Sequence, residues 1–281
     1  MTETRAYEDL IGAATDEYGA DFFSSEEFAL REAMEHGHYW HLHRRQVVLE
    51  ELLRAGVARS SSLIEIGCGI GTVATYLNGH GYRVDYADVH GAALEVARRV
   101  AERELGNTSR RFVRLDVTKT PLEARYDGVL MLDVLEHLPD DVAALTNVCK
   151  GLPSGGVVLF TVPAFKLLWS PWDDIEHHKR RYTLSQAKGL ATDAGLSVKR
   201  ATYFFFPLFF AALGVKALRG ARSFFENGER GAAQNISEMA ETKTSPLLNR
   251  LALGTLALEN PVRRASKLAL GTSVLCVAEK P

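Results

Sequence analysis

The sequence predicts an α/β protein built on a doubly wound, mostly parallel β-sheet. Short apolar segments alternate with amphipathic helical segments between residues 63 and 162, and a glycine-rich turn directly follows the first apolar segment. Such alternation is typical of βαβ units, and their right-handed crossovers place helices on both faces of the sheet.

Seven strands are expected in order along the chain. Each is a short run rich in apolar, β-branched or aromatic residues that is bounded by turn residues. The fourth run is almost wholly apolar, as a strand buried on both faces should be. The expected strands are residues 63–66, 82–87, 112–115, 126–132, 156–162, 196–202 and 272–278.

Helices are expected before and between these strands. Residues 42–55 and 92–104 carry apolar side chains at helical spacing, and residues 140–150 form a helix that Gly151 ends. A further helix begins at Thr183, because Thr183 and Gln186 have the spacing of a capping box. The region between the last two strands is also mostly helical in pattern.

Composition excludes several classes of protein. The 281 residues include 46% apolar residues, which rules out a wholly disordered chain. The 33 Lys and Arg residues against 35 Asp and Glu residues give a net charge of −2, so no nucleic acid partner is expected. Three widely spaced cysteines, a polar N-terminus and no apolar run of membrane-spanning length favour a cytoplasmic protein without a signal peptide.

The glycine-rich turn and the acids after it suggest a nucleoside-containing ligand. Glu65 precedes Gly67, Gly69 and Gly71, and glycines allow the backbone to approach a ligand closely. Asp88 follows the second strand, where an acid can bind ribose hydroxyls. The turn departs from the dinucleotide pattern G-x-G-x-x-G. An acid at position 65 would repel a pyrophosphate and would suit a ligand with ammonium and sulfonium groups. A purely structural turn and an NAD-type oxidoreductase are the alternatives.

Four segments together carry a family resemblance. They are E-I-G-C-G-I-G at 65–71, Y-A-D-V-H-G-A-A-L-E-V-A at 86–97, L-D-V at 115–117 and Y-D-G-V-L-M-L-D-V-L-E-H-L at 126–138. In this order and spacing they resemble the class I S-adenosylmethionine-dependent methyltransferase family. The resemblance covers residues 63 to about 165, and the last strands extend it to most of the chain. It implies a seven-stranded sheet whose last strand is antiparallel.

The resemblance implies a role for each matching residue. Gly67, Gly69 and Gly71 would pass under the methionine part of S-adenosylmethionine, and Glu65 would order that loop or meet the amino group. Asp88 would take the ribose hydroxyls. The remaining implied cofactor residues are Asp116 at the adenine amine, Val117 through its backbone N–H, and Asp133 near the methionyl end and the substrate entrance.

A second motif follows the fifth strand, at the sheet edge where ligands bind in doubly wound folds. Its D-x-x-x-H-x-R-R-Y run resembles one bacterial subgroup of the family, except that His177 stands where many members have glycine. His178 or His177 could remove a proton from an attacking hydroxyl or amine. The arginines and the tyrosine of this run could equally be structural. The candidates for substrate contact are Trp172, Arg180, Arg181, Tyr182 and, near the N-terminus, His38 and Trp40.

Other histidines are weaker candidates for a functional role. His137, after the fourth strand, is a further catalytic candidate or a structural residue. His38, Trp40 and Arg44 fit the H-x-W-x-x-x-R pattern of the same subgroup, which resembles an N-terminal helix lying over the cofactor as a lid. The histidines between residues 36 and 43 lack the spacing of a metal site, so no metal is expected.

The segment Tyr203–Phe210 is unusually aromatic, with five phenylalanines. It could be core, line a pocket for a long apolar substrate, or contact a membrane or a second subunit through residues 203–219. The chain thus divides into an N-terminal helical lid (1–58), a cofactor-binding core (59–203 and 271–281) and a helical insert over the substrate site (204–270).

The sequence therefore predicts a methyltransferase that moves a methyl group to O, N or C of a small-molecule or lipid-like acceptor, with a biosynthetic role. The acceptor itself is not identified by any motif. Two alternatives remain open: a protein of this fold with non-methylating chemistry, and a cofactor-binding partner associated with a membrane.

Overall fold

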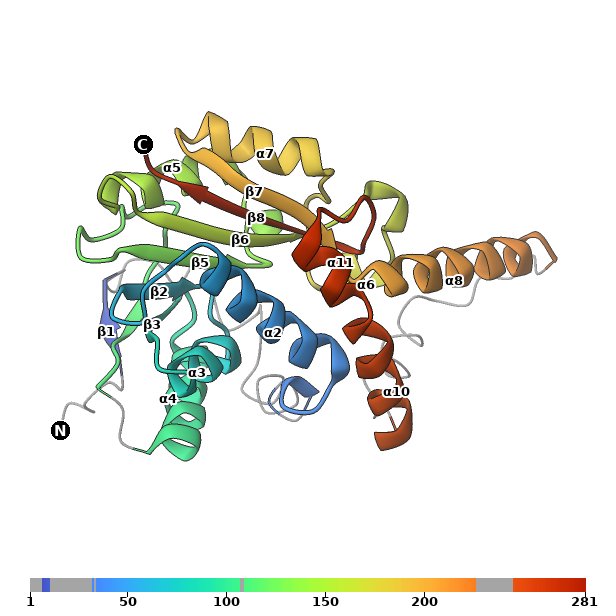
Figure 1. The fold of residues 1–281 in the computed structure, drawn as a ribbon, viewed down its shortest axis with the longest axis horizontal. Coiled ribbons are helices and arrows are strands. Elements are labelled where there is room, and N and C mark those ends of the chain that lie inside the picture. The colour runs from blue at the N-terminus through green and yellow to red at the C-terminus, as the bar shows by residue number, and fades with distance from the viewer. Residues whose placement is uncertain (1–6, 11–31, 33, 107–108, 226–244) are drawn as a thin grey trace.

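The structure is a computed structural model, which describes residues 7–10, 32, 34–106, 109–225 and 245–281 (Figure 1). Its described residues form one eight-stranded sheet in the order β1-β4-β3-β2-β5-β6-β8-β7. The strands are β1 (Glu8–Asp9), β2 (Ser62–Ile66), β3 (Arg83–Asp88), β4 (Phe112–Arg114), β5 (Gly128–Leu132), β6 (Val157–Pro163), β7 (Ser197–Phe204) and β8 (Ser273–Glu279).

The prediction of a mostly parallel α/β sheet is confirmed, and the strand count of seven was wrong by one. The additional strand is β1, which pairs in parallel with β4 through two residues, Glu8 and Asp9. Two residues are too few to produce a recognisable apolar pattern. The last strand, β8, runs antiparallel to both β6 and β7, as expected.

Two helical layers cover the sheet because neighbouring strand residues point to opposite faces. On β2, Leu63 packs in a cluster with α2, α3 and α4, whereas Ile64 packs in a cluster with α5 and α7. Both side chains are 1% exposed. The helices around the sheet are α2 (Tyr39–Arg54), α3 (Thr72–Gly79), α4 (Gly91–Leu105), α5 (Asp141–Gly151), α6 (Pro171–Ile175) and α7 (Leu184–Asp193).

The region between β7 and β8 contains α8 (Phe206–Phe225), α10 (Pro246–Ala257) and α11 (Glu259–Ala265). In Figure 1, α8 extends away from the sheet, and α11 connects α10 to the end of the sheet near β7 and β8. A buried ion network joins this region to α2 and β7: Glu51 on α2 accepts from Arg263 on α11 and, at 2.9 Å, from Arg200 on β7. The insert is therefore fixed to the core at its C-terminal end.

The aromatic segment is divided between core and surface. Phe204 and Phe205 are fully buried and Phe209 is 7% exposed, whereas Phe206 and Phe210 are 37% and 53% exposed. The core interpretation thus holds for three of the five phenylalanines. None of the helices in the described ranges combines the length and apolarity needed to cross a lipid bilayer. Contact of residues 203–219 with a membrane surface stays a prediction.

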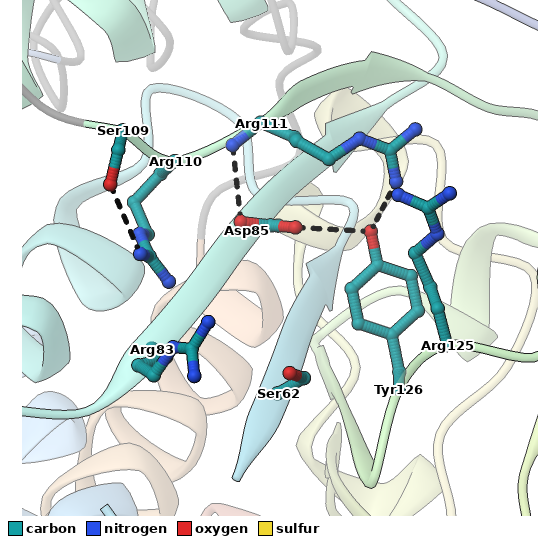
Figure 2. Close-up of a pocket in the computed structure, with 8 residues that line it drawn as sticks. All are labelled: Ser62, Arg83, Asp85, Ser109, Arg110, Arg111, Arg125 and Tyr126. Atoms are coloured by element: carbon teal, nitrogen blue, oxygen red, sulfur yellow. Dashed lines mark hydrogen bonds between the residues drawn. The ribbon is translucent and has the colours of Figure 1, made fainter. Parts of the chain in front are cut away.

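The two edges of the parallel sheet differ in chemistry. The carboxyl ends of β2, β3, β4 and β5 lead into the glycine-rich turn, Asp88, Asp116 and Asp133. The amino ends of the same strands border a cavity of about 380 Å³, and four of its eight lining residues are arginines (Figure 2). The carboxyl edge is where ligands bind in doubly wound folds.

Candidate active site

The glycine-rich turn requires glycine for different reasons at different positions. Gly67 has φ +69°, and a Cβ there would lie 2.5 Å from Cγ2 of Val134. Gly69 has φ +54°, but a Cβ there would meet nothing within 4 Å. Gly67 is thus needed for close packing, whereas the backbone at Gly69 faces open space that a ligand can approach.

Two acids hold this turn in place. Oδ2 of Asp88 accepts from the Gly69 N–H at 2.9 Å, and its Oδ1 accepts from the His90 N–H at 2.9 Å. Oε2 of Glu65 accepts from the Ala74 N–H at 2.7 Å, in the first turn of α3. Burial raises the pKa of Glu65 to about 8. The proposed loop-ordering role of Glu65 therefore has a contact that supports it.

Asp116 follows β4 and carries a buried acceptor atom. Its Oδ1 accepts from the Thr118 N–H and hydroxyl at 2.9 and 2.6 Å. Its Oδ2 is buried with no hydrogen-bond partner among the described residues, and Nζ of Lys119 is 3.8 Å away. The adjacent Val117 is 5% exposed and is held through its carbonyl by the side chain of Asn147. This edge can therefore accept a hydrogen bond from a ligand amine.

The helix α2 reaches the carboxyl edge through Arg44, whose Nη1 donates to Oδ2 of Asp133 at 2.6 Å. The guanidinium also lies over the ring of Trp40, 4.6 Å from its centroid, and Trp40 stacks on Phe205. His38 is the N-cap of α2 and accepts from the Trp40 N–H. His38 and Trp40 thus form and anchor the start of α2, next to the Arg44–Asp133 pair.

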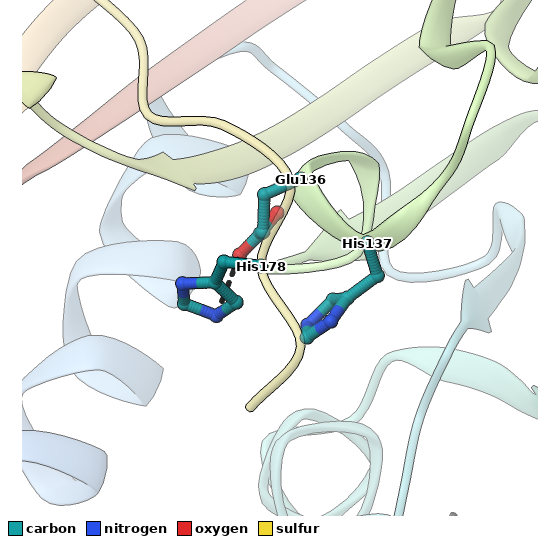
Figure 3. Close-up of side chains that lie close together, drawn as sticks. All are labelled: Glu136, His137 and His178. Atoms are coloured by element: carbon teal, nitrogen blue, oxygen red, sulfur yellow. Dashed lines mark ion pairs between the residues drawn. The ribbon is translucent and has the colours of Figure 1, made fainter. Parts of the chain in front are cut away.

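Glu136, His137 and His178 lie together beyond the ends of β5 and β6 (Figure 3). The imidazole rings of His137 and His178 are 4.8 Å apart, and Nε2 of His178 is 4.0 Å from Oε1 of Glu136. Glu136 is fully buried, and both carboxylate oxygens lack a hydrogen-bond partner among the described residues. Burial and the nearby charge of Asp133 raise its pKa well above the usual range. Glu136 was not among the predicted site residues.

Asp173 forms a hydrogen bond with His178, and it too was not among the site residues predicted from the sequence. Its Oδ1 accepts from Nδ1–H of His178 at 2.9 Å, and Arg181 donates to both carboxylate oxygens at 2.6 and 2.9 Å. Burial alone would raise the pKa of Asp173, but the hydrogen bonds from His178 and Arg181 outweigh it and hold the pKa below its usual range. Asp173 is therefore ionised, and it fixes the orientation of the His178 ring.

The arginines and the tyrosine of the second motif contact protein groups. Arg181 binds Asp173, and Arg180 pairs with Asp141 at 3.0 Å. The Tyr182 hydroxyl donates to the same Asp141 at 2.7 Å. These contacts favour the structural interpretation over a clamp for a substrate anion, because the carboxylates they bind belong to the chain itself. Trp172 lies half-buried on the short helix α6.

His177 differs from His178 in its exposure, its backbone conformation and its neighbours. It is exposed and has φ +56°, the left-handed conformation that glycine adopts most easily. A glycine at this position, as in many members of the subgroup that the motif resembles, would suit that backbone. The side chain of His177 lies outside the Glu136–His137–His178 cluster.

The histidines between residues 36 and 43 contact different parts of the protein. His36 pairs with Glu104, and the buried His43 pairs with Glu259 at 2.9 Å. In the part of the chain that the structure describes, the side chains with the spacing of a metal site are instead Glu136, His137 and His178, whose ligand atoms lie within 4.8 Å of one another.

This sheet order, a glycine turn after the central strand β2 and acids at the ends of β3 and β4 are the arrangement of a class I S-adenosylmethionine-dependent methyltransferase. The family described as a methyltransferase domain matches residues 39–201, which is more than half of the chain. The chain belongs to this methyltransferase domain family, and its cofactor is S-adenosylmethionine. The open backbone at Gly69 and the unpartnered buried Oδ2 of Asp116 fit that cofactor.

Curated relatives match the central part of the chain. The ubiquinone biosynthesis O-methyltransferase of Alkalilimnicola ehrlichii is 31% identical over 99 residues, 35% of this chain and 40% of that protein. The enzyme of the same name from Acinetobacter baylyi is 31% identical over 111 residues, 38% of this chain and 46% of that protein. The matched region thus spans less than half of the length of either relative.

Solved structures share the fold. Phosphoethanolamine N-methyltransferase 2 of Haemonchus contortus, bound to S-adenosyl-L-methionine, superposes with a TM-score of 0.60 at 16% identity, covering 96% of this chain and 61% of that chain. Magnesium protoporphyrin IX methyltransferase of Synechocystis PCC 6803, bound to S-adenosylhomocysteine, gives a TM-score of 0.54 at 18% identity, covering 66% and 92%. At these identities the likeness concerns the fold alone.

Proposed function

We propose that this chain transfers the methyl group of S-adenosylmethionine to a hydroxyl group of a small-molecule or lipid-like acceptor in a biosynthetic pathway. The observation that carries the proposal is the pairing of His178 with the buried carboxylate of Asp173. A histidine held in this way can accept a proton from a hydroxyl group. The similarity to ubiquinone biosynthesis O-methyltransferases supports oxygen as the methylated atom.

The methionine part of the cofactor is assigned to the glycine-rich turn. Gly67, Gly69 and Gly71 would lie beneath it, and the open space at Gly69 supports this assignment. Glu65 acts through the backbone: its hydrogen bond to the Ala74 N–H joins the end of β2 to the start of α3 and so orders the turn between them.

The nucleoside part is assigned to the ends of β3 and β4. Asp88 would accept from the ribose hydroxyls, while Oδ2 of Asp116 and the N–H of Val117 would bind the adenine edge. Oδ2 of Asp116 makes no hydrogen bond among the described residues, although Nζ of Lys119 is 3.8 Å away, and this supports the adenine assignment because a buried acceptor without a hydrogen bond is costly. Asp133, held by Arg44, would lie near the methionyl end and the acceptor.

When bound, S-adenosylmethionine supplies an electrophilic methyl group on a sulfonium sulfur. The chain would supply proton removal: Nε2 of His178 would take the acceptor's hydroxyl proton as the cofactor's carbon–sulfur bond is replaced by the new carbon–oxygen bond, with the electron pair left on the sulfur. Asp173 keeps Nδ1–H of His178 in place and stabilises the imidazolium that results. Arg181 in turn holds Asp173, so Arg181 and Asp173 are positioning residues.

Glu136 and His137 complete the surroundings of the base. With its pKa raised well above the usual range, Glu136 favours the neutral carboxyl form. His137 packs its ring edge-on against His178 and limits the ring's rotation.

The test compares His178→Ala with the native protein on a panel of phenolic acceptors of different acidity. Removing a general base should lower kcat by about 10²–10⁴-fold and leave the Kd for S-adenosylhomocysteine within about twofold. The loss should be smallest for phenols that are already ionised at the assay pH. Asp173→Asn should lower kcat in the same direction, and His80→Ala, an exposed histidine on the far side of α3, is the control.

Two results would contradict the proposal. An equal loss of kcat for acidic and non-acidic phenols would remove His178 as the base. Methyl transfer to amines but to none of the hydroxyl acceptors would show that the methylated atom is nitrogen.

A further inference from the structure

A cavity lies at the edge of the sheet opposite to the proposed methyl-transfer site. It has a volume of about 380 Å³ and is bordered by the residues at the amino ends of β2, β3, β4 and β5 (Figure 2). Asp85 and Asp88 stand near opposite ends of the strand β3, and this strand separates the cavity from the cofactor turn. A ligand in this cavity is therefore distinct from both cofactor and acceptor.

Arginines are concentrated in the lining of the cavity although the whole chain has a net charge of −2. The lining contains four arginines and one aspartate, and the neighbouring Glu8 and Glu123 pair with Arg111 and Arg125. Two serines and a tyrosine add hydroxyl groups. The lining residues are Ser62, Arg83, Asp85, Ser109, Arg110, Arg111, Arg125 and Tyr126.

One side of the cavity is fixed by internal hydrogen bonds. The Arg111 N–H donates to Oδ1 of Asp85 at 3.1 Å, and the buried Tyr126 hydroxyl donates to Oδ2 at 3.2 Å, so the carboxylate is occupied. Glu123 pairs with Arg111 at 3.4 Å and with Arg125 at 2.7 Å. These contacts neutralise and immobilise this side.

The other side presents Arg83, Arg110 and Ser109 (Figure 2). Nη2 of Arg110 donates to the Ser109 hydroxyl at 3.2 Å, which holds the two side chains together at the rim. In the described part of the chain, no carboxylate lies within ion-pair distance of Arg83. Arg83 begins β3 and Arg110 lies in the segment just before β4, and both lie on the same side of Asp85 (Figure 2).

We propose that this cavity binds a small phosphate-bearing anion, with Arg83 and Arg110 as its principal ligands. Guanidinium groups match phosphate oxygens with paired N–H donors, and the Ser62 and Ser109 hydroxyls can supply further hydrogen bonds. The volume is that of a small-molecule site, which favours a phosphorylated metabolite over the backbone of a nucleic acid. This site is independent of the proposed acceptor chemistry.

The probe is inorganic pyrophosphate, titrated calorimetrically into the full chain at low salt with and without saturating S-adenosylhomocysteine. Binding in both conditions is expected. Arg83→Gln should weaken binding about tenfold and Arg83→Gln/Arg110→Gln should weaken it further, because each substitution removes a charged donor. Arg99→Gln, at an exposed arginine on α4, is the matched control and should leave the Kd within about twofold.

Four results would overturn the proposal. Pyrophosphate could fail to bind, or could bind equally well to the double variant. Displacement by S-adenosylhomocysteine would locate the anion at the cofactor turn instead. Tighter binding of a short single-stranded oligonucleotide than of pyrophosphate would identify an extended phosphate backbone, not a small metabolite, as the ligand. Thermal melting of each variant separates loss of binding from loss of folding.

Discussion

Asp88→Ala tests the assignment of the cofactor's ribose most directly. The Asp88 side chain is nearly buried and accepts from the Gly69 N–H, the His90 N–H and Nδ1–H of His90 at 2.9, 2.9 and 3.0 Å. Removing the carboxylate takes away the anchor of the turn at the position that faces open space, together with the proposed ribose contact. A hydrogen bond to a charged group contributes about 1.5–3 kcal/mol, so the Kd for S-adenosylhomocysteine should rise roughly tenfold to 150-fold.

Calorimetric titration with S-adenosylhomocysteine measures this Kd. Asp88→Asn separates the two contributions, because an amide keeps one acceptor for the Gly69 N–H but loses the charge and should weaken binding less than alanine does. Asp193→Ala, at an exposed aspartate at the end of α7, is the control for removal of a carboxylate. If Asp88→Ala folds and its Kd stays within about twofold of the native value, Asp88 does not bind the ribose.

Three further predictions concern stability. Between about pH 4.5 and 8 the folded protein keeps the Glu65 proton that the unfolded chain releases, so the free energy of unfolding falls as pH rises. Glu65→Gln should flatten this dependence of the free energy of unfolding on pH, as measured by urea unfolding. Equal pH dependence in the variant and the native protein would contradict this. His177→Gly should raise the free energy of unfolding by about 1 kcal/mol, because glycine relieves the positive φ; a lower stability would refute the strain argument. Arg263→Ala breaks the buried Glu51–Arg263 pair and leaves Glu51 with Arg200 as its buried partner, so it should lower stability more than Arg264→Ala, at an exposed ion pair, which should cost under about 1 kcal/mol; equal melting temperatures would contradict this.

The sheet was largely predictable because its strands are buried on both faces and read as apolar runs. The residues at the strand ends follow from the same pattern, so Asp88, Asp116 and Asp133 were found with their strands. β1 could not be found in this way. Its two residues are polar and form a strand only because β4 offers an unpaired edge.

The contacts around the catalytic candidate were less predictable. The sequence offers two adjacent acids, Asp173 and Asp174, and only the fold distinguishes them: Asp173 binds His178, while Asp174 accepts from the indole N–H of Trp169. Arg181 poses the same difficulty. An arginine that binds a substrate anion and an arginine that holds a buried carboxylate of the protein cannot be told apart in the sequence. Glu136 lies next to a predicted site residue, but its missing hydrogen bonds are visible only in three dimensions.

The position of β8 between β6 and β7 affects how the chain can fold during synthesis. β7 pairs with β8 and not with β6, so it cannot join the sheet until residues 273–279 are available. The ion pairs from His43 to Glu259 and from Glu51 to Arg263 also join residues more than 200 positions apart. Closing such loops is entropically costly and slow. The helix α2, which carries Arg44, therefore makes these contacts only after residues 259–263 have left the ribosome.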